Sequence, residues 1–448
     1  MSDSSYLVAV VGAGPAGLFA ARRLAEHGVR VVLFNRDVKP GGLAEYGIYP
    51  DKLKMKRALR EQFRQILASP RIDYYGNITV CSENSVTLEV LLSVFHAVLV
   101  TTGAQGTKWL RVPGETLPGV YHAKNLVYHY NRLPPFSQRN FLIGQRVVIV
   151  GGGNVMIDVA RYLIRERKVA EVVAVIRRGP AEVRFSRKEF AAIAANLDRK
   201  ALDEEFARLP PLLRAVGQDA QALQQTFLAA QTKALPPVSD TRFRFEFLAS
   251  PVRVVGDLIN GISALKVENN ELILADGQVK ARGTSVTRPI EADTVIFAVG
   301  DTVERMLCLP VYGDVYATVQ EPRFPVQGVS FEACNPDMRQ PVEGVFLAGW
   351  ARQPSTGLVG YAKHDGEMAA EAVWQYLQTR TPSKNVEALL RRFDRRVEEI
   401  QQPLVRKTDL PRLEAAERQQ AERLGVEDFK FTTNEEMFAA MGLLPQSP

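Results

Sequence analysis

The hydrophobic pattern near the N-terminus predicts a strand, a helix and a second strand in succession. Residues 7–11 form an uninterrupted β-branched run, and residues 18–27 have apolar positions at helical spacing. A second apolar run at 29–34 comes directly after Gly28. Apolar runs this short and continuous are typical of strands buried on both faces of a parallel sheet. We therefore expect a strand–helix–strand unit in which Gly28 ends the helix.

The turn between the first strand and the helix has the glycine spacing of a dinucleotide-binding loop. It has the pattern GxGxxG and consists of Gly12, Ala13, Gly14, Pro15, Ala16 and Gly17. The glycines of such a loop permit a tight turn, close approach of the backbone to a pyrophosphate, and close packing of helix on strand. The N–H groups at the helix N-terminus favour phosphate charge. The segment thus predicts a dinucleotide site.

The end of the second strand departs from this pattern. Units of this kind usually have Asp or Glu there, which binds a ribose hydroxyl. Here the position is Asn35, which can accept and donate hydrogen bonds but has no charge. Asp37 is the alternative residue for this role.

A second unit of the same kind follows later in the chain. Apolar runs at 146–150 and 172–176 enclose a helical pattern at 157–164. The turn after the first of these runs consists of Gly151, Gly152, Gly153, Asn154 and Val155. Met156 stands where the pattern has its third glycine. This segment predicts a second dinucleotide site.

The second unit ends with two arginines, Arg177 and Arg178, instead of an acidic residue. An arginine pair at this position suits the 2′-phosphate of NADP, whereas an acidic residue would favour NAD. The alternative interpretation is a solvated surface pair with no ligand.

Two dinucleotide units in one chain predict a flavin dinucleotide on one and a nicotinamide dinucleotide on the other. Strand patterns at 98–103 and 293–300 flank the second unit, which we interpret as an insertion. We expect an α/β fold with two Rossmann-like dinucleotide-binding domains. The predicted FAD-binding domain has a first part at 1–104 and a second part, with a C-terminal tail, at 298–448, and the inserted NADP-binding domain covers 105–297.

The composition agrees with a folded protein of several domains. Of the 448 residues, 46% are hydrophobic and 24% are charged, which argues against disorder. The net charge of +6 is too small to imply nucleic acid, although it suits an acidic protein partner. No run approaches the ~18 apolar residues of a membrane span, and no signal peptide is recognisable. We expect a cytoplasmic protein with no nucleic-acid partner and no membrane span.

The three cysteines, Cys81, Cys308 and Cys334, are far apart in the sequence. They form neither a CxxC pair nor the spacing of a zinc or iron–sulfur site, and the five histidines show no ligand spacing. We therefore expect no metal site and no redox-active cysteine pair. Cys308 and Cys334 are interpreted as small apolar residues.

Together with several further motifs, these segments resemble the adrenodoxin-reductase-type ferredoxin–NADP reductases, which are FAD flavoproteins with two domains. The resemblance covers nearly the whole chain. Its motifs are residues 11–17, 42–51, 75–77, 112–119 and 151–161, Arg177 to Pro180 with Lys188 and Glu189, and Gly349 and Trp350 with Thr356 and Gly357. In the tail the matching residues are Leu413, Glu417, Gly425 and Lys430.

The resemblance implies where both cofactors bind. FAD would lie on the first domain, with its pyrophosphate at the GxGxxG loop and its ribose near Asn35. The other residues implied for FAD are Gly42, Leu43, Gly47, Gly103, Gly349, Trp350, Thr356, Gly357 and Leu358. NADP(H) would contact Gly151, Gly152, Gly153, Asn154, Val155, Arg177, Arg178 and Glu189.

Some positions near the implied flavin depart from the family. Glu45 replaces a usual basic residue, and Lys52 replaces a usual histidine. Gln353 stands where the family has an arginine, for which Arg352 is a candidate substitute. Beyond the flavin itself, the candidates for a catalytic role are Lys52 and Glu45, as an ion pair, and His364, as a proton relay. The alternatives are a surface pair and a structural histidine.

The resemblance implies a flavoprotein oxidoreductase that passes electrons from NADPH, by hydride transfer to flavin N5, to a one-electron carrier such as ferredoxin. Such carriers are generally acidic, and basic residues would steer them. The candidate basic residues are Arg184, Arg187, Lys188, Arg242 and Arg244. One alternative keeps both cofactors but has another acceptor: a flavodoxin, a quinone or a dedicated partner enzyme. Another alternative is a non-catalytic nucleotide-binding redox sensor.

Overall fold

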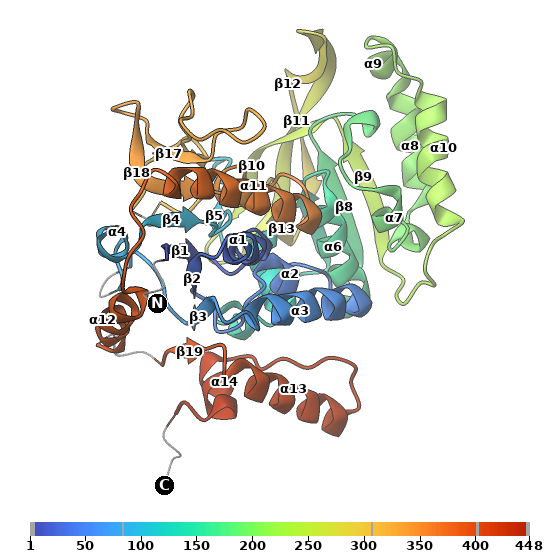
Figure 1. Ribbon diagram of the computed structural model, residues 1–448. Helices are drawn as coiled ribbons and strands as arrows, with labels where there is room; N and C mark the ends of the chain where they lie inside the picture. Colours follow the sequence, from blue (N-terminus) through green and yellow to red (C-terminus); the bar gives the residue numbers. More distant parts are fainter. Residues whose placement is uncertain (1–4, 83–84, 306–307, 400–402, 445–448) are drawn as a thin grey trace. The chain divides into compact units, whose positions relative to one another are not determined.

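The computed structural model describes residues 5–82, 85–305, 308–399 and 403–444, which fall into two compact units. The first unit comprises Met1–Lys108, Asn131–Gln138 and Gly300–Pro448, and the second comprises Trp109–Tyr130 and Arg139–Val299. The second unit thus interrupts the sequence of the first (Figure 1). Each unit has its own parallel sheet, which confirms the α/β expectation.

The first unit is built on a seven-stranded sheet. In spatial order its strands are β17 (Glu332–Asn335), β18 (Gln340–Leu347), β4 (Ala97–Val100), β1 (Leu7–Val11), β2 (Arg30–Asn35), β3 (Ile72–Gly76) and β19 (Val405–Arg406). The five inner strands are parallel, and β17 and β19 pair antiparallel at the two edges. Every residue of β1 is buried, as the continuous apolar run predicts.

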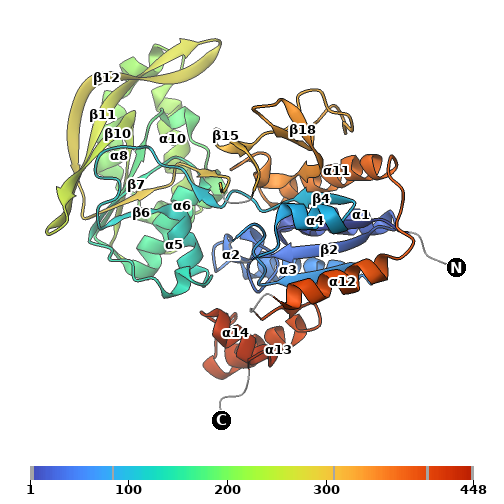
Figure 2. The same ribbon diagram turned by 90° about the vertical axis from the view of Figure 1, so that its left-hand side faces the viewer.

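Both faces of this sheet are covered, which explains why its central strands are apolar throughout. Alternate residues of β1 belong to two cores: Val8 and Val10 to one, Leu7 and Ala9 to the other. The first core includes α1 (Pro15–Glu26), α3 (Leu53–Leu67), α11 (Val359–Leu377), α13 (Leu410–Leu424) and α14 (Asn434–Met441). The second includes α4 (Leu88–Val94) and α12 (Val386–Glu398), and Figure 2 shows α12 beside β2.

Helices α1 and α11 pack closely because a glycine lies where they meet. A Cβ on Gly366 of α11 would lie 2.2 Å from the carbonyl oxygen of Ala16 in α1, so no larger residue fits. This contact fixes the start of α11 beside the start of α1.

Short elements complete the first unit. They are α2 (Leu43–Tyr46), β5 (Gly106–Thr107), β14 (Asp301–Thr302), β15 (Val311–Tyr312), β16 (Val315–Tyr316) and the 3₁₀ turns Phe136–Gln138 and Gly349–Ala351. Strands β5 and β14 pair antiparallel, close to Lys108 and Gly300, where the chain leaves and re-enters this unit.

The second unit is built on a five-stranded parallel sheet. Its strands, in spatial order, are β6 (Val120–His122), β13 (Thr294–Phe297), β7 (Arg146–Val150), β8 (Glu171–Ile176) and β9 (Arg242–Phe247). Its helices are α5 (Ala123–Tyr130), α6 (Asn154–Tyr162) with a π-helical continuation at Leu163–Arg167, α7 (Arg187–Phe190), α8 (Arg199–Arg208), α9 (Pro210–Arg214) and α10 (Ala220–Gln231), with 3₁₀ turns at Pro180–Glu182 and Ala194–Asn196. The strands and helix of the predicted unit are thus confirmed.

A three-stranded antiparallel sheet also belongs to the second unit, and the sequence analysis did not predict it. It consists of β10 (Ala249–Asp257), β11 (Gly261–Ala275) and β12 (Gln278–Glu291). Asp276 and Gly277 both have positive φ and form the tight turn between β11 and β12. Among the described residues of the chain, no helix is both long and apolar enough to cross a membrane.

Candidate functional site

The GxGxxG loop joins β1 to α1, and its glycines are required by the surrounding backbone. Gly12 has a φ of +113°, and a Cβ there would lie 2.6 Å from the Thr101 carbonyl oxygen. A Cβ on Gly17 would lie 2.0 Å from the Gly12 carbonyl oxygen. A Cβ on Gly14 would meet nothing within 4 Å, and Gly14 is the N-cap of α1. The open side at Gly14 and the helix N-terminus together form a cradle that suits a pyrophosphate.

A pair of glycines from the loop after β2 lies directly on this cradle. The Gly41 N–H donates to the Ala13 carbonyl oxygen at 2.7 Å. Gly42 has a φ of +49°, and a Cβ there would lie 3.1 Å from the Gly14 Cα. The chain continues into α2, so the predicted site residues Leu43 and Gly47 follow immediately.

The loop at the end of β18, which is far from the GxGxxG loop in the sequence, also approaches the cradle. Gly349 has a φ of +64°, and a Cβ there would lie 2.8 Å from the Ala16 Cβ. The Trp350 indole N–H donates to the Thr356 carbonyl oxygen at 2.8 Å, which closes the loop on itself. Thr356, Gly357 and Leu358 are exposed. Gly42 and Gly349, both predicted for FAD, therefore lie against the start of α1, and Gly103 lies just beyond β4.

Two residues that support these loops, Thr101 and Asp365, were not predicted from the sequence. The Thr101 hydroxyl donates to the Gly12 carbonyl oxygen at 2.7 Å. The Asp365 carboxylate accepts the Gly349 N–H at 2.6 Å and also binds Arg352. Arg352 is buried over the ring of Phe331, so it supports the loop from within; this does not support the idea that it substitutes for the family's arginine. Single polar residues like these have no sequence pattern that would single them out.

The side-chain amide of Asn35 forms hydrogen bonds within the protein through both its oxygen and its nitrogen. Its amide Nδ2 donates to the carbonyl oxygens of Asp37 at 2.8 Å and Lys39 at 2.9 Å, and lies 3.2 Å from the Tyr74 hydroxyl. Its Oδ1 accepts the Ala13 N–H at 3.1 Å. The amide thus ties the loop after β2 to the GxGxxG loop, a role that needs a donor as well as an acceptor.

Asn35→Asp, which introduces the acidic residue usual in such units, is expected to lower the free energy of unfolding by about 2–3 kcal/mol. A carboxylate cannot donate, so its oxygen would face two carbonyl oxygens in a buried position. Urea unfolding followed by circular dichroism measures the change, with Asp37→Asn as the matched control. A variant as stable as the parent protein would contradict this role of Asn35.

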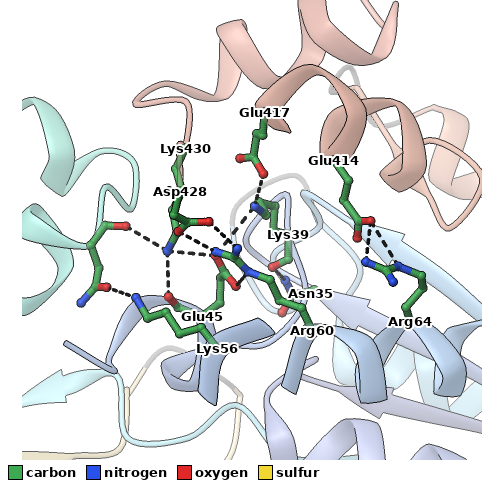
Figure 3. A network of polar contacts seen from close by, with 11 residues as sticks. Asn35, Lys39, Glu45, Lys56, Arg60, Arg64, Glu414, Glu417, Asp428 and Lys430 are labelled. Carbon is green, nitrogen blue, oxygen red and sulfur yellow. Dashed lines mark hydrogen bonds and ion pairs between the residues drawn. The ribbon is translucent and has the colours of Figure 1, made fainter. Parts of the chain in front are cut away.

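A network of buried ionic contacts holds α2 in place (Figure 3). Its centre is Glu45, whose side chain is only 3% exposed. Arg60 of α3 donates to both carboxylate oxygens of Glu45, at 2.8 and 2.7 Å. Lys430 from the C-terminal segment lies 2.9 Å from the same carboxylate, and Lys39 lies at 3.7 Å. Glu45 thus joins α2 to three separate parts of the chain.

The C-terminal segment takes part in this network at three points. The Lys430 ammonium also donates to the Glu45 carbonyl oxygen at 2.8 Å. Asp428 pairs with Arg60 at 2.6 Å, and Glu417 of α13 pairs with Lys39 at 2.5 Å. The tail residues Glu417 and Lys430, which match the family pattern, therefore anchor the C-terminal segment to the loop after β2 and to α2.

The three cations determine the charge state of Glu45. Burial alone would raise the pKa of this carboxyl, but Lys430, Lys39 and Arg60 hold the pKa well below its ordinary value.

The hypothesis of a Glu45–Lys52 ion pair is not supported, because the carboxylate is occupied by these partners. Lys52 is the N-cap residue of α3. His364 is exposed on α11, one residue before Asp365. A catalytic role for Glu45, Lys52 or His364 stays a prediction.

Lys56 lies beside this network, and its environment opposes the positive charge of its side chain. It is 2% exposed, and its ammonium donates to the Asn131 Oδ1 at 2.6 Å. Burial, together with the nearby Lys430, lowers the pKa of Lys56 to about 7. In the unfolded chain a lysine has a pKa of about 10.4. Between these values the unfolded chain binds the proton and the folded protein does not, so stability rises with pH.

Lys56→Met is therefore expected to flatten the dependence of unfolding free energy on pH between about 7 and 9. Lys56 contributes a slope of up to about 1.4 kcal/mol per pH unit in this window. Urea unfolding at several pH values measures the slope, and exposed Lys54 on the same helix supplies the control, Lys54→Met. Equal slopes in the parent protein and in Lys56→Met would refute this assignment.

The second predicted loop joins β7 to α6 and has the same construction. Gly151 has a φ of +149°, and a Cβ there would lie 2.4 Å from the Ala298 carbonyl oxygen. Gly153 is the N-cap of α6, and a Cβ on it would meet nothing within 4 Å. Met156, in place of the third glycine, is fully buried inside the unit. Val155, in the first turn of α6, is exposed.

The segment after β8 folds over this second loop. The Arg184 N–H donates to the Gly152 carbonyl oxygen at 2.7 Å, and the Ser186 N–H donates to the Asn154 Oδ1 at 3.0 Å. Arg177, at the end of β8, is exposed, and Arg178 is half-buried. Glu189 lies on α7, whose N-cap is Ser186. The residues predicted for NADP(H) thus share one edge of the second sheet.

Comparison with known proteins identifies the family. A family model described as pyridine nucleotide-disulphide oxidoreductase matches residues 6–201. The NADPH:adrenodoxin oxidoreductase of Salvelinus fontinalis is 30% identical, over 83% of this chain and 78% of that protein. The chain belongs to the adrenodoxin-reductase-type ferredoxin–NADP reductases. Another relative is the NADPH-ferredoxin reductase FprA of Mycobacterium leprae, 29% identical over 83% of this chain and 84% of that one.

A solved structure agrees with membership of this reductase family. Mycobacterium tuberculosis FprA in complex with NADPH matches with a TM-score of 0.80 at 25% identity, over 98% of this chain and 99% of that one. As a member of the family, the protein is a flavoprotein oxidoreductase that takes FAD and NADP(H). The fold and the cofactors expected from the sequence are confirmed. The cradles at Gly14 and Gly153 fit two dinucleotides, since both combine an open glycine with a helix N-terminus.

Proposed function

We propose that this protein oxidises NADPH and passes the electrons one at a time to an acidic, ferredoxin-like carrier. The observation that supports it best is the presence of two separate glycine cradles, one in each unit, in a chain related to NADPH-dependent reductases. When bound, FAD supplies the hydride acceptance and the single-electron release that no side chain can supply. We propose that this takes place in the cytoplasm.

The protein's own residues bind and orient the cofactors in this proposal. In the first unit, the N–H groups at the start of α1 would hold the FAD pyrophosphate, and the loops at Gly42 and Gly349 lie beside that position. In the second unit, the start of α6 would hold the NADPH pyrophosphate, and Arg177 and Arg178 would bind the 2′-phosphate. Asn35, Thr101 and Asp365 act indirectly, by fixing the loops that make these contacts.

The anaerobic absorbance spectrum before and after one equivalent of NADPH tests this function. We expect flavin bands near ~450 nm that bleach when NADPH is added. A protein that stays colourless after incubation with FAD, or whose bands persist with NADPH, would instead favour a nucleotide-binding redox sensor without turnover. Asn35 is the departure from pattern that makes this second function worth testing.

The arrangement of charged residues on the surface is relevant to the binding of an acidic carrier. Arg242 pairs with Asp198 at 2.7 Å, and Arg244 pairs with Glu171 at 3.1 Å. These two arginines are therefore neutralised, and the hypothesis that they steer a carrier is not supported. Exposed basic side chains are present at Arg184, Arg187 and Lys188 around α7, and at Arg391, Arg392, Arg395 and Arg396 on α12. The arginines of α12 were not singled out from the sequence.

A cytochrome c reduction assay identifies the class of acceptor. Reduction that requires added ferredoxin, and that slows as salt rises, would support an acidic one-electron carrier, because salt screens charge between the partners. Reduction supported only by a flavodoxin, a quinone or a dedicated partner enzyme would establish the same cofactor chemistry with another electron acceptor.

A further inference from the structure

Two residues of the C-terminal segment hold the chain on either side of the glycine turn at residues 41–42 (Figure 3). Before the turn, the Lys39 ammonium lies 2.5 Å from a carboxylate oxygen of Glu417 in α13. After the turn, the Lys430 ammonium donates to the Glu45 carbonyl oxygen at 2.8 Å and lies 2.9 Å from a carboxylate oxygen of the same residue. The turn is therefore fixed from both ends by one distant part of the chain.

Lys430 also joins α2 to a third part of the first unit. Its side chain is only 6% exposed, and its ammonium donates to the Asn131 carbonyl oxygen at 3.3 Å and lies 4.7 Å from the centre of the Tyr46 ring. The Lys430 carbonyl oxygen accepts from the Arg132 guanidinium at 3.3 Å. With two acceptor oxygens on Glu45 and one on Asn131, the three N–H donors of the ammonium have an acceptor each. Lys430 thus has a fixed position against α2.

The turn at residues 41–42 has no free space where it meets the cradle at Gly14. The Gly41 N–H donates to the Ala13 carbonyl oxygen at 2.7 Å, and a Cβ on Gly42 would lie 3.1 Å from the Gly14 Cα. Contacts this close are lost when either partner shifts. A displacement of α2 therefore moves the turn away from the open side of the cradle.

We propose that Lys430 and Glu417 are positioning residues for FAD, which hold the turn at residues 41–42 on the cradle and so determine how tightly FAD is retained. The inference rests on the proposed position of FAD at the GxGxxG loop. It extends the FAD site to Lys430, which lies 385 residues from Glu45 in the chain. Coupling between two binding equilibria is reciprocal, so FAD must in turn strengthen the docking of the C-terminal segment.

Hydrogen–deuterium exchange of the whole parent protein, with and without FAD, tests this reciprocal effect. We expect FAD to slow amide exchange in α13 and at residues 425–433, as well as in α1 and α2. Strand β11 in the second unit serves as the internal standard, and its exchange should stay the same. Protection of α1 by FAD with no change in α13 or at residues 425–433 would overturn the proposal.

Titration of FAD, followed by its fluorescence, tests the two residues directly. We expect Lys430→Met to raise the Kd for FAD by roughly tenfold or more. Glu417→Gln should raise the Kd less, because the amide oxygen still accepts from Lys39. The matched control is Lys407→Met: Lys407 of the same segment donates to the carbonyl oxygens of Ser69 at 2.9 Å and Ile72 at 2.6 Å, and these acceptors are not part of α2. Its Kd should be close to that of the parent protein.

Two results of the titration would overturn the proposal. The first is a Lys430→Met variant that binds FAD as tightly as the parent protein. The second is an equal loss in Lys430→Met and Lys407→Met, which would indicate a general loosening of the C-terminal segment. A parent protein that binds no FAD would overturn the proposed function together with this inference. If circular dichroism shows that Lys430→Met does not fold, the exchange experiment on the parent protein decides.

Discussion

Glu45→Arg is expected to destabilise the first unit by about 3–5 kcal/mol, although it introduces the kind of residue that the family usually has at this position. The substitution removes the buried carboxylate that Arg60 and Lys430 share and that lies near Lys39. It also adds another cation to the same buried space. Uncompensated buried charge is costly, because these groups give up hydration without gaining a partner.

Urea unfolding followed by circular dichroism measures the effect. The matched control is Glu414→Arg, which breaks the pair between Arg64 and Glu414, an exposed contact of α3 and α13 in Figure 3. That control should change stability by less than about 1 kcal/mol, because exposed ion pairs contribute little. The double variant Glu45→Lys with Lys430→Glu should recover part of the loss. Equal stability of Glu45→Arg and the parent protein would show that the network does not hold α2.

The glycine loops could be predicted from the sequence because their chemistry is local. Each loop, one around Gly12 and the other around Gly151, consists of consecutive residues. Apolar runs on each side of it predict the strands. The partners of Glu45 could not be predicted in this way. Arg60, Lys430 and Lys39 come from different parts of the chain, and only the folded first unit brings them together.

The antiparallel sheet was missed for a different physical reason. Most residues of β12 are exposed on both faces, so its sequence has no apolar period that would mark a strand. Its order comes from pairing with β11, which runs in register across most of its length.

Replacing Arg177 and Arg178 together with alanine is expected to lower kcat/KM for NADPH by roughly 10²–10⁴-fold and to leave kcat/KM for NADH nearly unchanged. A hydrogen bond to a charged group contributes about 1.5–3 kcal/mol, so two such contacts account for a loss of this size. NADH has no 2′-phosphate, so its kcat/KM should not depend on these two arginines. Flavin reduction by each nucleotide, followed in a stopped-flow spectrometer, gives the two values.

The ratio of the two kcat/KM values separates the functional interpretation from a solvated surface pair. Arg187→Ala, an exposed arginine of the same unit, removes a positive charge without touching the end of β8 and should leave the ratio unchanged. If the double variant also keeps the ratio of the parent protein, Arg177 and Arg178 are surface charges, and NADPH is selected elsewhere. If the ratio falls while the unfolding midpoint stays the same, the loss lies in 2′-phosphate recognition and not in the fold.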